Sequence, residues 1–121
     1  MTDSTLVLTV ATDKLRYAPG DPITVTMAVM NRSGVAVTLN FSTGQRYDFT
    51  LKDSAGKVVW QWAAERMFTQ VLGEETIVPG GELVYREQFT GRLAPGSYRI
   101  VGTLVAMDGP RSARATVVVG N

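Results

Sequence analysis

The sequence contains no cysteine and no histidine. The absence of cysteine excludes disulfides, thiolate nucleophiles and cysteine-based zinc sites. The absence of histidine removes the usual general base and the most common metal ligand. Neither a serine–histidine–aspartate nor a cysteine–histidine catalytic system can be built from these residues. The sequence therefore predicts a protein that is not an enzyme.

Two other routes to catalysis or metal binding depend on lysine and on paired carboxylates. A serine–lysine dyad would need Lys14, Lys52 or Lys57, and each lies at or beside a predicted turn, where it is solvated. The one adjacent acidic pair, Glu74-Glu75, falls in a predicted loop. No calcium-loop array and no glycine-rich phosphate loop occurs. We therefore expect no cofactor and no metal.

Net charge and hydropathy limit the kind of partner and the cellular compartment that we expect. Lys and Arg number 12 against 11 Asp and Glu, so the net charge is +1 and no basic field for nucleic acid is present. No apolar run approaches the roughly 20 residues that a membrane helix needs. Residues 1–4 do not resemble a signal peptide, so we expect a cytoplasmic protein, although a truncated secreted precursor stays open. The sequons at Asn31 and Asn40 are interpreted as chance matches.

The β-branched residues indicate the fold class. Val, Thr and Ile make up 33 residues, and their stiff side chains favour strands over helices. The apolar positions alternate with a period of two, as in a half-buried strand. The predicted inward faces carry Leu6, Leu8 and Val10; Ile23, Val25, Met27 and Val29; Leu83, Tyr85 and Phe89; and Tyr98, Ile100, Leu104 and Ala106. The protein is predicted to be all-β and antiparallel.

Turn residues separate the strands at the spacing of a sandwich. Pro19-Gly20, Pro79-Gly80 and Pro95-Gly96 each stand just before a strand, where proline and glycine suit a type II turn. Further strands are predicted at Val35–Phe41, Tyr47–Lys52, Lys57–Trp62, Phe68–Leu72 and Ala113–Val119, with one helical turn near 63–67. Tyr98, two residues after its Pro-Gly, resembles the tyrosine corner of Greek-key sandwiches. We predict one domain over residues 1–121 with about eight to ten short strands.

The central stretch is rich in aromatic and amide side chains. Trp60 and Trp62 are two residues apart and share one face of a predicted strand, where core packing is favoured over a carbohydrate platform that would need both rings exposed. Gln45 and Gln70 are predicted to satisfy backbone groups of this irregular region. Asp48 is predicted to face solvent or to make a sheet-to-sheet hydrogen bond.

The same stretch is similar to the BsuPI family of bacterial intracellular proteinase inhibitors. The residues that carry the resemblance are Phe41-Ser42-Thr43-Gly44-Gln45-Arg46-Tyr47-Asp48-Phe49, Gly56, Val59-Trp60-Gln61-Trp62, Phe68-Thr69-Gln70 and Pro79-Gly80. It covers roughly Ile23 to Leu104 and departs from the family at Ala63, where a serine is expected. It implies an immunoglobulin-like sandwich that binds a subtilisin-type serine protease reversibly and without a cofactor.

Two segments are candidates for contact with a protein partner. Arg66-Met67-Phe68 lies between the helical turn and a predicted strand, although core packing is the more common role for a methionine such as Met67. Met107-Asp108 lies at a hairpin tip that can equally be a plain turn. An edge strand at either terminus could also pair with a partner strand. The alternative function is a structural or adhesion module of a bacterial envelope protein, as the Tyr17–Asp21 segment resembles such modules.

Overall fold

The computed structural model describes residues 6–120, which form ten strands and one short 3₁₀ helix. The all-β prediction is confirmed. The elements are β1 (Leu6–Thr12), β2 (Arg16–Tyr17), β3 (Ile23–Asn31), β4 (Val37–Phe41), β5 (Tyr47–Asp53), β6 (Val58–Gln61), η1 (Trp62–Glu65), β7 (Gly73–Ile77), β8 (Glu82–Phe89), β9 (Gly96–Leu104) and β10 (Arg111–Val119).

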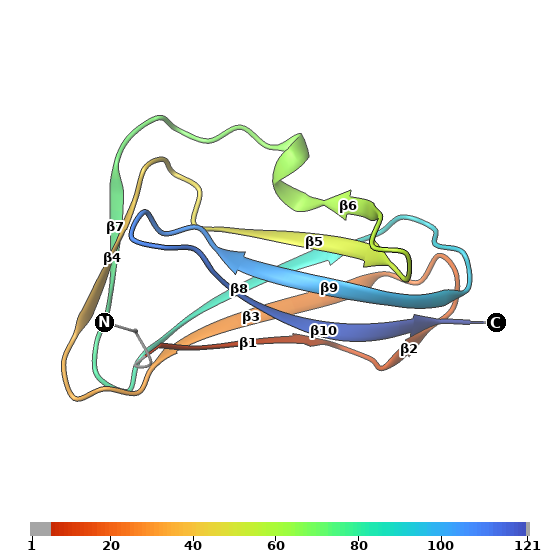
Figure 1. The fold of residues 1–121 in the computed structure, drawn as a ribbon, viewed down its shortest axis with the longest axis horizontal. Coiled ribbons are helices and arrows are strands. Elements are labelled where there is room, and N and C mark those ends of the chain that lie inside the picture. The colour runs from red at the N-terminus through yellow and green to blue at the C-terminus, as the bar shows by residue number, and fades with distance from the viewer. Residues whose placement is uncertain (1–5, 121) are drawn as a thin grey trace.

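Two sheets face each other as an immunoglobulin-like sandwich (Figure 1). One has the order β1-β3-β8 and the other the order β2-β10-β9-β5-β6. Neighbouring strands are antiparallel, except that β2 runs parallel to the end of β10. The chain leaves β8 in the first sheet and enters the second as β9, between β5 and β10. This crossing is the predicted Greek-key connection.

The period-two pattern places the main core between the sheets. All four predicted inward residues of β3 are buried, and Phe49, Leu51 and Ile100 meet them from the other sheet. Gly102 leaves room in β9, since a Cβ there would lie 2.8 Å from Val10 Cγ2. Burial of such side chains is the main source of stability, at roughly 1.5–3 kcal/mol for each large apolar group.

The predicted tyrosine corner is confirmed. Tyr98 lies near the start of β9, and its ring is buried. Its hydroxyl donates a hydrogen bond of 2.6 Å to the carbonyl oxygen of Ala94, across the turn that contains Pro95 and Gly96. The bond holds the crossing from β8 to β9 against the core.

A separate two-stranded ribbon, β4 paired with β7, closes one end of the sandwich (left in Figure 1). Its buried side chains include Leu39, Phe41 and Ile77. The side chain of Asn31 is fully buried, and its amide donates to the carbonyl oxygens of Val35 and Ile77, both at 2.9 Å. Because the side-chain amide of Asn31 is buried and hydrogen-bonded within the domain, this asparagine has a structural role. That agrees with the interpretation of its sequon as a chance match.

Several predicted boundaries are wrong. No strand spans 68–72, and the strand that follows η1 is β7 at 73–77, so Glu74-Glu75 lies in a strand and not in a loop. The predicted helical turn is confirmed but lies at 62–65, which removes Trp62 from β6. Strand β4 begins at Val37 and not at Val35. Glu74-Glu75 was assigned to a loop because both residues are polar. A two-stranded ribbon exposes alternate residues to solvent, so a strand of this kind can carry them.

Candidate functional site

The segment from Arg66 to Leu72 connects η1 to β7 and has no regular secondary structure. It exposes three apolar side chains: Met67 is 98%, Leu72 73% and Val71 66% accessible. The backbone leaves η1 in an extended conformation, with φ −120° and ψ 153° at Arg66. The alternative role for Met67, core packing, is therefore contradicted, because its neighbours and not Met67 itself are held by the body of the domain.

Trp62 supports the start of this segment. It is 9% exposed, and Phe68 packs against it with ring centroids 5.8 Å apart. The guanidinium of Arg66 lies over the Trp62 ring, 4.9 Å from its centroid, in a cation–π contact. The backbone N–H of Arg66 donates a hydrogen bond of 3.1 Å to the carbonyl oxygen of Ala63. Arg66 and Phe68 thus both contact one buried indole, while Met67 between them contacts solvent.

Asp48 fixes the 3₁₀ helix that carries Trp62. Its side chain is 9% exposed and accepts hydrogen bonds from the backbone N–H groups of Phe49 at 2.8 Å and Ala63 at 2.9 Å. The side-chain amide of Gln61 donates to it at 2.6 Å. Both alternatives expected for Asp48, a solvent-facing side chain and a sheet-to-sheet hydrogen bond, are wrong, because the irregular turn after β6 in the same sheet leaves backbone donors that a nearby carboxylate satisfies.

The middle of the segment is held by the loop that connects β4 to β5. The N–H of Gly44 donates to the carbonyl oxygen of Thr69 at 2.9 Å. A Cβ at position 44 would lie 2.5 Å from Thr69 Oγ1, so any larger residue would force the Thr69 side chain to shift. The amide of Gln70 donates to the Phe68 carbonyl at 3.3 Å, which confirms its predicted role.

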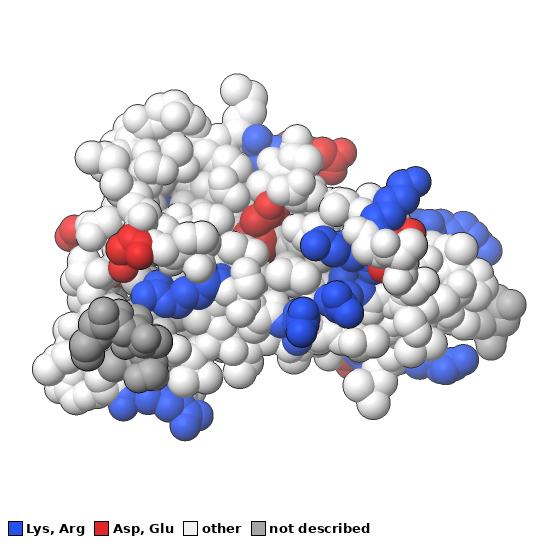
Figure 2. All heavy atoms as spheres, in the orientation of Figure 1, with Lys and Arg blue, Asp and Glu red and all other residues white. Residues whose placement is uncertain are grey.

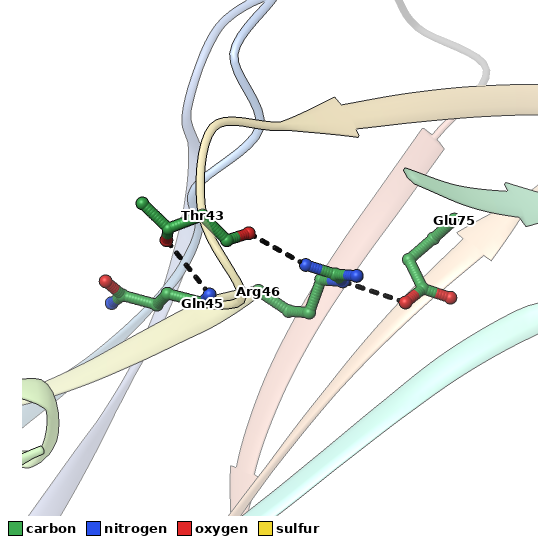
Figure 3. A network of polar contacts seen from close by, with 4 residues as sticks. All are labelled: Thr43, Gln45, Arg46 and Glu75. Atoms are coloured by element: carbon green, nitrogen blue, oxygen red, sulfur yellow. Dashed lines mark hydrogen bonds and ion pairs between the residues drawn. The ribbon is translucent and has the colours of Figure 1, made fainter. Parts of the chain in front are cut away.

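Arg46 connects the same loop to β7, where the segment ends (Figure 3). Its Nε forms an ion pair of 2.8 Å with Glu75, and its Nη1 donates to the Thr43 carbonyl at 3.1 Å. The loop is closed internally as well: the hydroxyl of Thr43 accepts from the Gln45 N–H at 3.0 Å, and the Gln45 amide donates to the Tyr47 carbonyl at 3.0 Å. The Gln45 prediction is confirmed.

The second candidate, Met107-Asp108, lies in the turn between β9 and β10 and is exposed, Met107 by 59%. The Met107 N–H donates to the Asn40 carbonyl at 2.7 Å, and Val105 donates to the Arg46 carbonyl at 3.1 Å. Both candidate segments therefore contact the connection between β4 and β5, and they lie at the same end of the sandwich (Figure 1). The sequence did not indicate that the fold brings them together.

A stack of aromatic rings continues from Trp62 into the core. Tyr47 lies 4.6 Å from Trp62 and 4.5 Å from Tyr85, centroid to centroid, in nearly parallel planes. The Tyr47 hydroxyl donates to the carboxylate of Glu87. Burial, and then this hydrogen bond, raise the pKa of Tyr47, and burial raises the pKa of Tyr85 to about 12. The hydroxyl of Tyr85 is buried with no hydrogen-bond partner among residues 6–120.

The two tyrosines should therefore respond differently to substitution by phenylalanine. We expect Tyr85→Phe to leave the free energy of unfolding at pH 7 nearly unchanged, because no hydrogen bond is lost. Tyr47→Phe should lower it by about 1–2 kcal/mol, because the carboxylate of Glu87 loses its donor. Urea denaturation of both variants measures the difference, and equal losses would contradict the assignment.

The same raised pKa values predict an alkaline limit of stability. A tyrosine whose pKa is higher in the folded state stabilises the fold fully below its unfolded pKa, near 10. That contribution is lost as the pH rises from 10 through about 12. Tyr85→Phe should make this loss shallower in the same urea experiment.

Trp60 and Trp62 both pack into the main core. Trp60 lies 5.3 Å from Phe89, and Trp62 is almost fully buried. The carbohydrate platform required both rings to be exposed and is contradicted. Within residues 6–120, no three acidic, histidine or cysteine side chains are grouped so that they could hold a metal ion. None of the described helices is long and apolar enough to span a membrane.

Sequence reasoning did not predict the contacts of three residues that hold the segment: Gly44 and Arg46, which only carried the family resemblance, and Asp48, for which other surroundings were expected. The available signal was the spacing of Gly44 and Arg46: a glycine permits a close backbone approach, and an arginine two residues later places a cation beside it. Their partners Thr69, Glu75 and Ala63 are 15 to 29 residues further along the chain, so local sequence patterns did not reveal the contacts.

The sequence profile of the BsuPI family, described as intracellular proteinase inhibitors, matches residues 10–109. The chain belongs to this family. The matched region includes the exposed segment, the loop that holds it and strands of both sheets, and it ends before β10. A comparison with curated protein sequences finds no match. The family is described as one of inhibitors and not as one of enzymes.

Solved structures support the BsuPI fold at low sequence identity. The sporulation control protein Spo0M from Bacillus subtilis is 18% identical with a TM-score of 0.67, over 98% of this chain and 51% of Spo0M. A cycloisomaltooligosaccharide glucanotransferase from Paenibacillus sp. is 22% identical with a TM-score of 0.60, over 93% of this chain and 13% of the enzyme. The CARDB domain of the PF1109 protein from Pyrococcus furiosus is 17% identical with a TM-score of 0.54, over 99% and 93%. The chain thus spans about half of Spo0M and a small part of the glucanotransferase.

Proposed function

We propose that this BsuPI chain acts as a single domain that inhibits an intracellular protease of the subtilisin type, by docking its 66–72 segment in the substrate cleft. The observation that supports this most directly is the position of Met67, which is 98% exposed between two residues that pack on buried Trp62. In this proposal the Met67 side chain enters an apolar specificity pocket of the protease.

The anchoring of the segment is what an inhibitor needs. A protease binds its substrate in an extended form, and a free peptide must lose conformational entropy to adopt it. Here the chain is held before Met67 by Trp62 and after it by the hydrogen bond between Gly44 and Thr69. A segment that is already ordered loses less entropy on binding, so the same contacts produce a higher affinity.

The proposal gives the second candidate a supporting role. Met107 and Asp108 lie on the β9–β10 turn, which contacts the connection between β4 and β5 through Asn40 and Arg46. A stable protein interface buries about 800 Å² on each partner, more than one short segment supplies. We therefore place Met107 and Asp108 at the rim of the same interface.

A titration tests the proposed function. The purified chain is added to an intracellular subtilisin, and the hydrolysis of a small chromogenic substrate is followed; we expect a reversible loss of activity that saturates at one chain per protease. A trypsin-like protease is the control, because its charged specificity pocket should reject Met67. Unchanged subtilisin activity at micromolar chain would contradict the proposal and would favour the structural or adhesion module.

A further inference from the structure

The outer face of the five-stranded sheet carries three neighbouring cations. Lys52 in β5 is directly opposite Arg99 in β9, and Arg114 in β10 is opposite Val101, two residues along β9 from Arg99. The buried residues Leu51, Tyr98 and Ile100 alternate with them, so all three cations point away from the core. Basic side chains gather over β9 and β10 in Figure 2.

These cations are not neutralised by the chain. Among residues 6–120, none of Lys52, Arg99 and Arg114 forms an ion pair or a side-chain hydrogen bond. Like charges on directly opposed strand positions repel each other and destabilise a sheet. The protein thus keeps an unfavourable cross-strand arrangement of like charges.

The acids beside this face are already used. Asp48 accepts hydrogen bonds from Ala63 and Gln61, as described above. Asp53, at the end of β5, accepts from the backbone N–H groups of Ala55 and Lys57, both at 2.9 Å. Both carboxylates cap backbone turns, so their hydrogen-bonding capacity is directed at the chain itself. Neither carboxylate forms an ion pair with Lys52, Arg99 or Arg114, so the N–H groups of these cations stay available to a partner.

The surface around the cations is concave. An open depression of about 490 Å³ is lined by the three cations together with Val101, Ser112 and Ala113. A second depression of about 410 Å³ continues from Arg99 towards Thr116 and the β5–β6 turn. Small side chains between the cations let an extended chain approach the sheet. Arginine adds a planar fork that can bind a carboxylate through two hydrogen bonds.

We propose that this face, defined by Lys52, Arg99 and Arg114, is a docking surface for an acidic segment of a second protein. In an extended acidic segment alternate side chains point to the same side, so carboxylates on every second residue can face the three cations together. Nucleic acid is disfavoured, because the net charge is +1 and the cations do not extend into a long basic stripe.

The docking surface is separate from the proposed inhibitory segment. Lys52 is near the end of β5 and Arg99 near the start of β9, whereas the β4–β5 and β9–β10 connections lie at the other ends of these strands (Figure 1). The 66–72 segment is tied to those connections through Gly44 and Arg46. A protease and an acidic partner can therefore bind together, and this inference does not depend on the proposed function.

A matched pair of variants tests the surface. The face variant is Lys52→Thr, Arg99→Thr and Arg114→Thr, and the control variant is Lys14→Thr, Arg32→Thr and Arg92→Thr, three exposed cations elsewhere. Each replaces three cations, so each changes the net charge from +1 to −2. The probe is a fluorescent peptide of alternating glutamate and serine, and binding is followed by anisotropy at roughly 50 mM and 500 mM salt.

We expect the natural chain to bind the peptide at low salt and to release it at high salt. The face variant should lose about tenfold or more in affinity, and the control variant should stay within about twofold. The face variant should also melt no lower than the natural chain, because cross-strand repulsion is removed. Protease inhibition, where present, should be the same in both variants.

Four results would overturn this inference. Equal losses in the two variants would mean that only net charge matters. Absence of binding by the natural chain at low salt would remove the surface altogether. Stronger binding of a single-stranded oligonucleotide or of anionic vesicles than of the peptide would assign the cations to a different class of partner. A lower melting temperature confined to the face variant would show that these side chains serve the fold.

Discussion

Met67→Asp should weaken protease inhibition by roughly 100-fold or more while leaving the fold intact. In the complex the methionine is proposed to leave water for an apolar pocket, which contributes about 2–3 kcal/mol. A carboxylate in the same place loses that contribution and must also be desolvated without a partner. Because the side chain is 98% exposed in the free chain, its stability should change by less than about 0.5 kcal/mol.

Two further variants make this result specific. Met67→Leu keeps an apolar side chain of similar volume and should retain inhibition within about tenfold. Met107→Asp changes the other exposed methionine, at the rim of the proposed interface, and should cost much less than Met67→Asp. Inhibition constants and thermal melts of all three provide the comparison. If Met107→Asp abolishes inhibition and Met67→Asp does not, the β9–β10 turn is the docking segment.

Trp62→Ala should lower the free energy of unfolding by about 3–5 kcal/mol, the range for a buried aromatic residue. The indole contacts Tyr47 inside the core and Phe68 and Arg66 at the surface, so its removal leaves a cavity and releases the start of the 66–72 segment. The melting temperature should fall by about 10–20 °C. Inhibition should weaken even at temperatures where the variant stays folded, because the segment must then be ordered on binding.

Trp60→Ala is the matched control for this loss of order. Trp60 packs on Phe89 in the same core but does not contact the 66–72 segment through a ring or cation–π interaction. Trp60→Ala should therefore lower the stability of the domain while the folded fraction keeps its inhibition of the protease. Trp62→Phe should recover much of both properties, since no hydrogen bond of the indole N–H to residues 6–120 is lost. Equal effects of Trp60→Ala and Trp62→Ala on inhibition would contradict the anchoring role of Trp62.

The strands could be predicted because their signal is local. Ile23, Val25, Met27 and Val29 alternate with polar residues, and burial of one face of a strand requires nothing more than this alternation. The tyrosine corner was equally accessible, since Tyr98 and its acceptor Ala94 are four residues apart. Errors began where the period-two pattern ended, between Trp62 and Gly73, because no repeat there distinguishes a strand from a connection.

The candidate site shows the limit of a local pattern most clearly. Met67 has an apolar side chain, and most side chains of this type lie in the core. Its exposure follows from contacts that no local pattern contains: Trp62 occupies the inward direction, Asp48 fixes the turn that carries Trp62, and Gly44 holds Thr69. These contacts join residues brought together by the folding of distant strands.

By itself the sequence determined the class of this protein and its family. The β-branched alternation indicated an all-β chain, since it is a property of composition and of short-range spacing, and the Gly44–Phe49 and Trp60–Trp62 residues carried the resemblance to the BsuPI family. Only the tertiary structure decided which side chains are exposed and which of them lie together. The exposure of Met67 and the grouping of Lys52, Arg99 and Arg114 both depend on strand pairing between residues far apart in the chain. Pairing of that kind is set by the packing of the whole sandwich and not by any one segment.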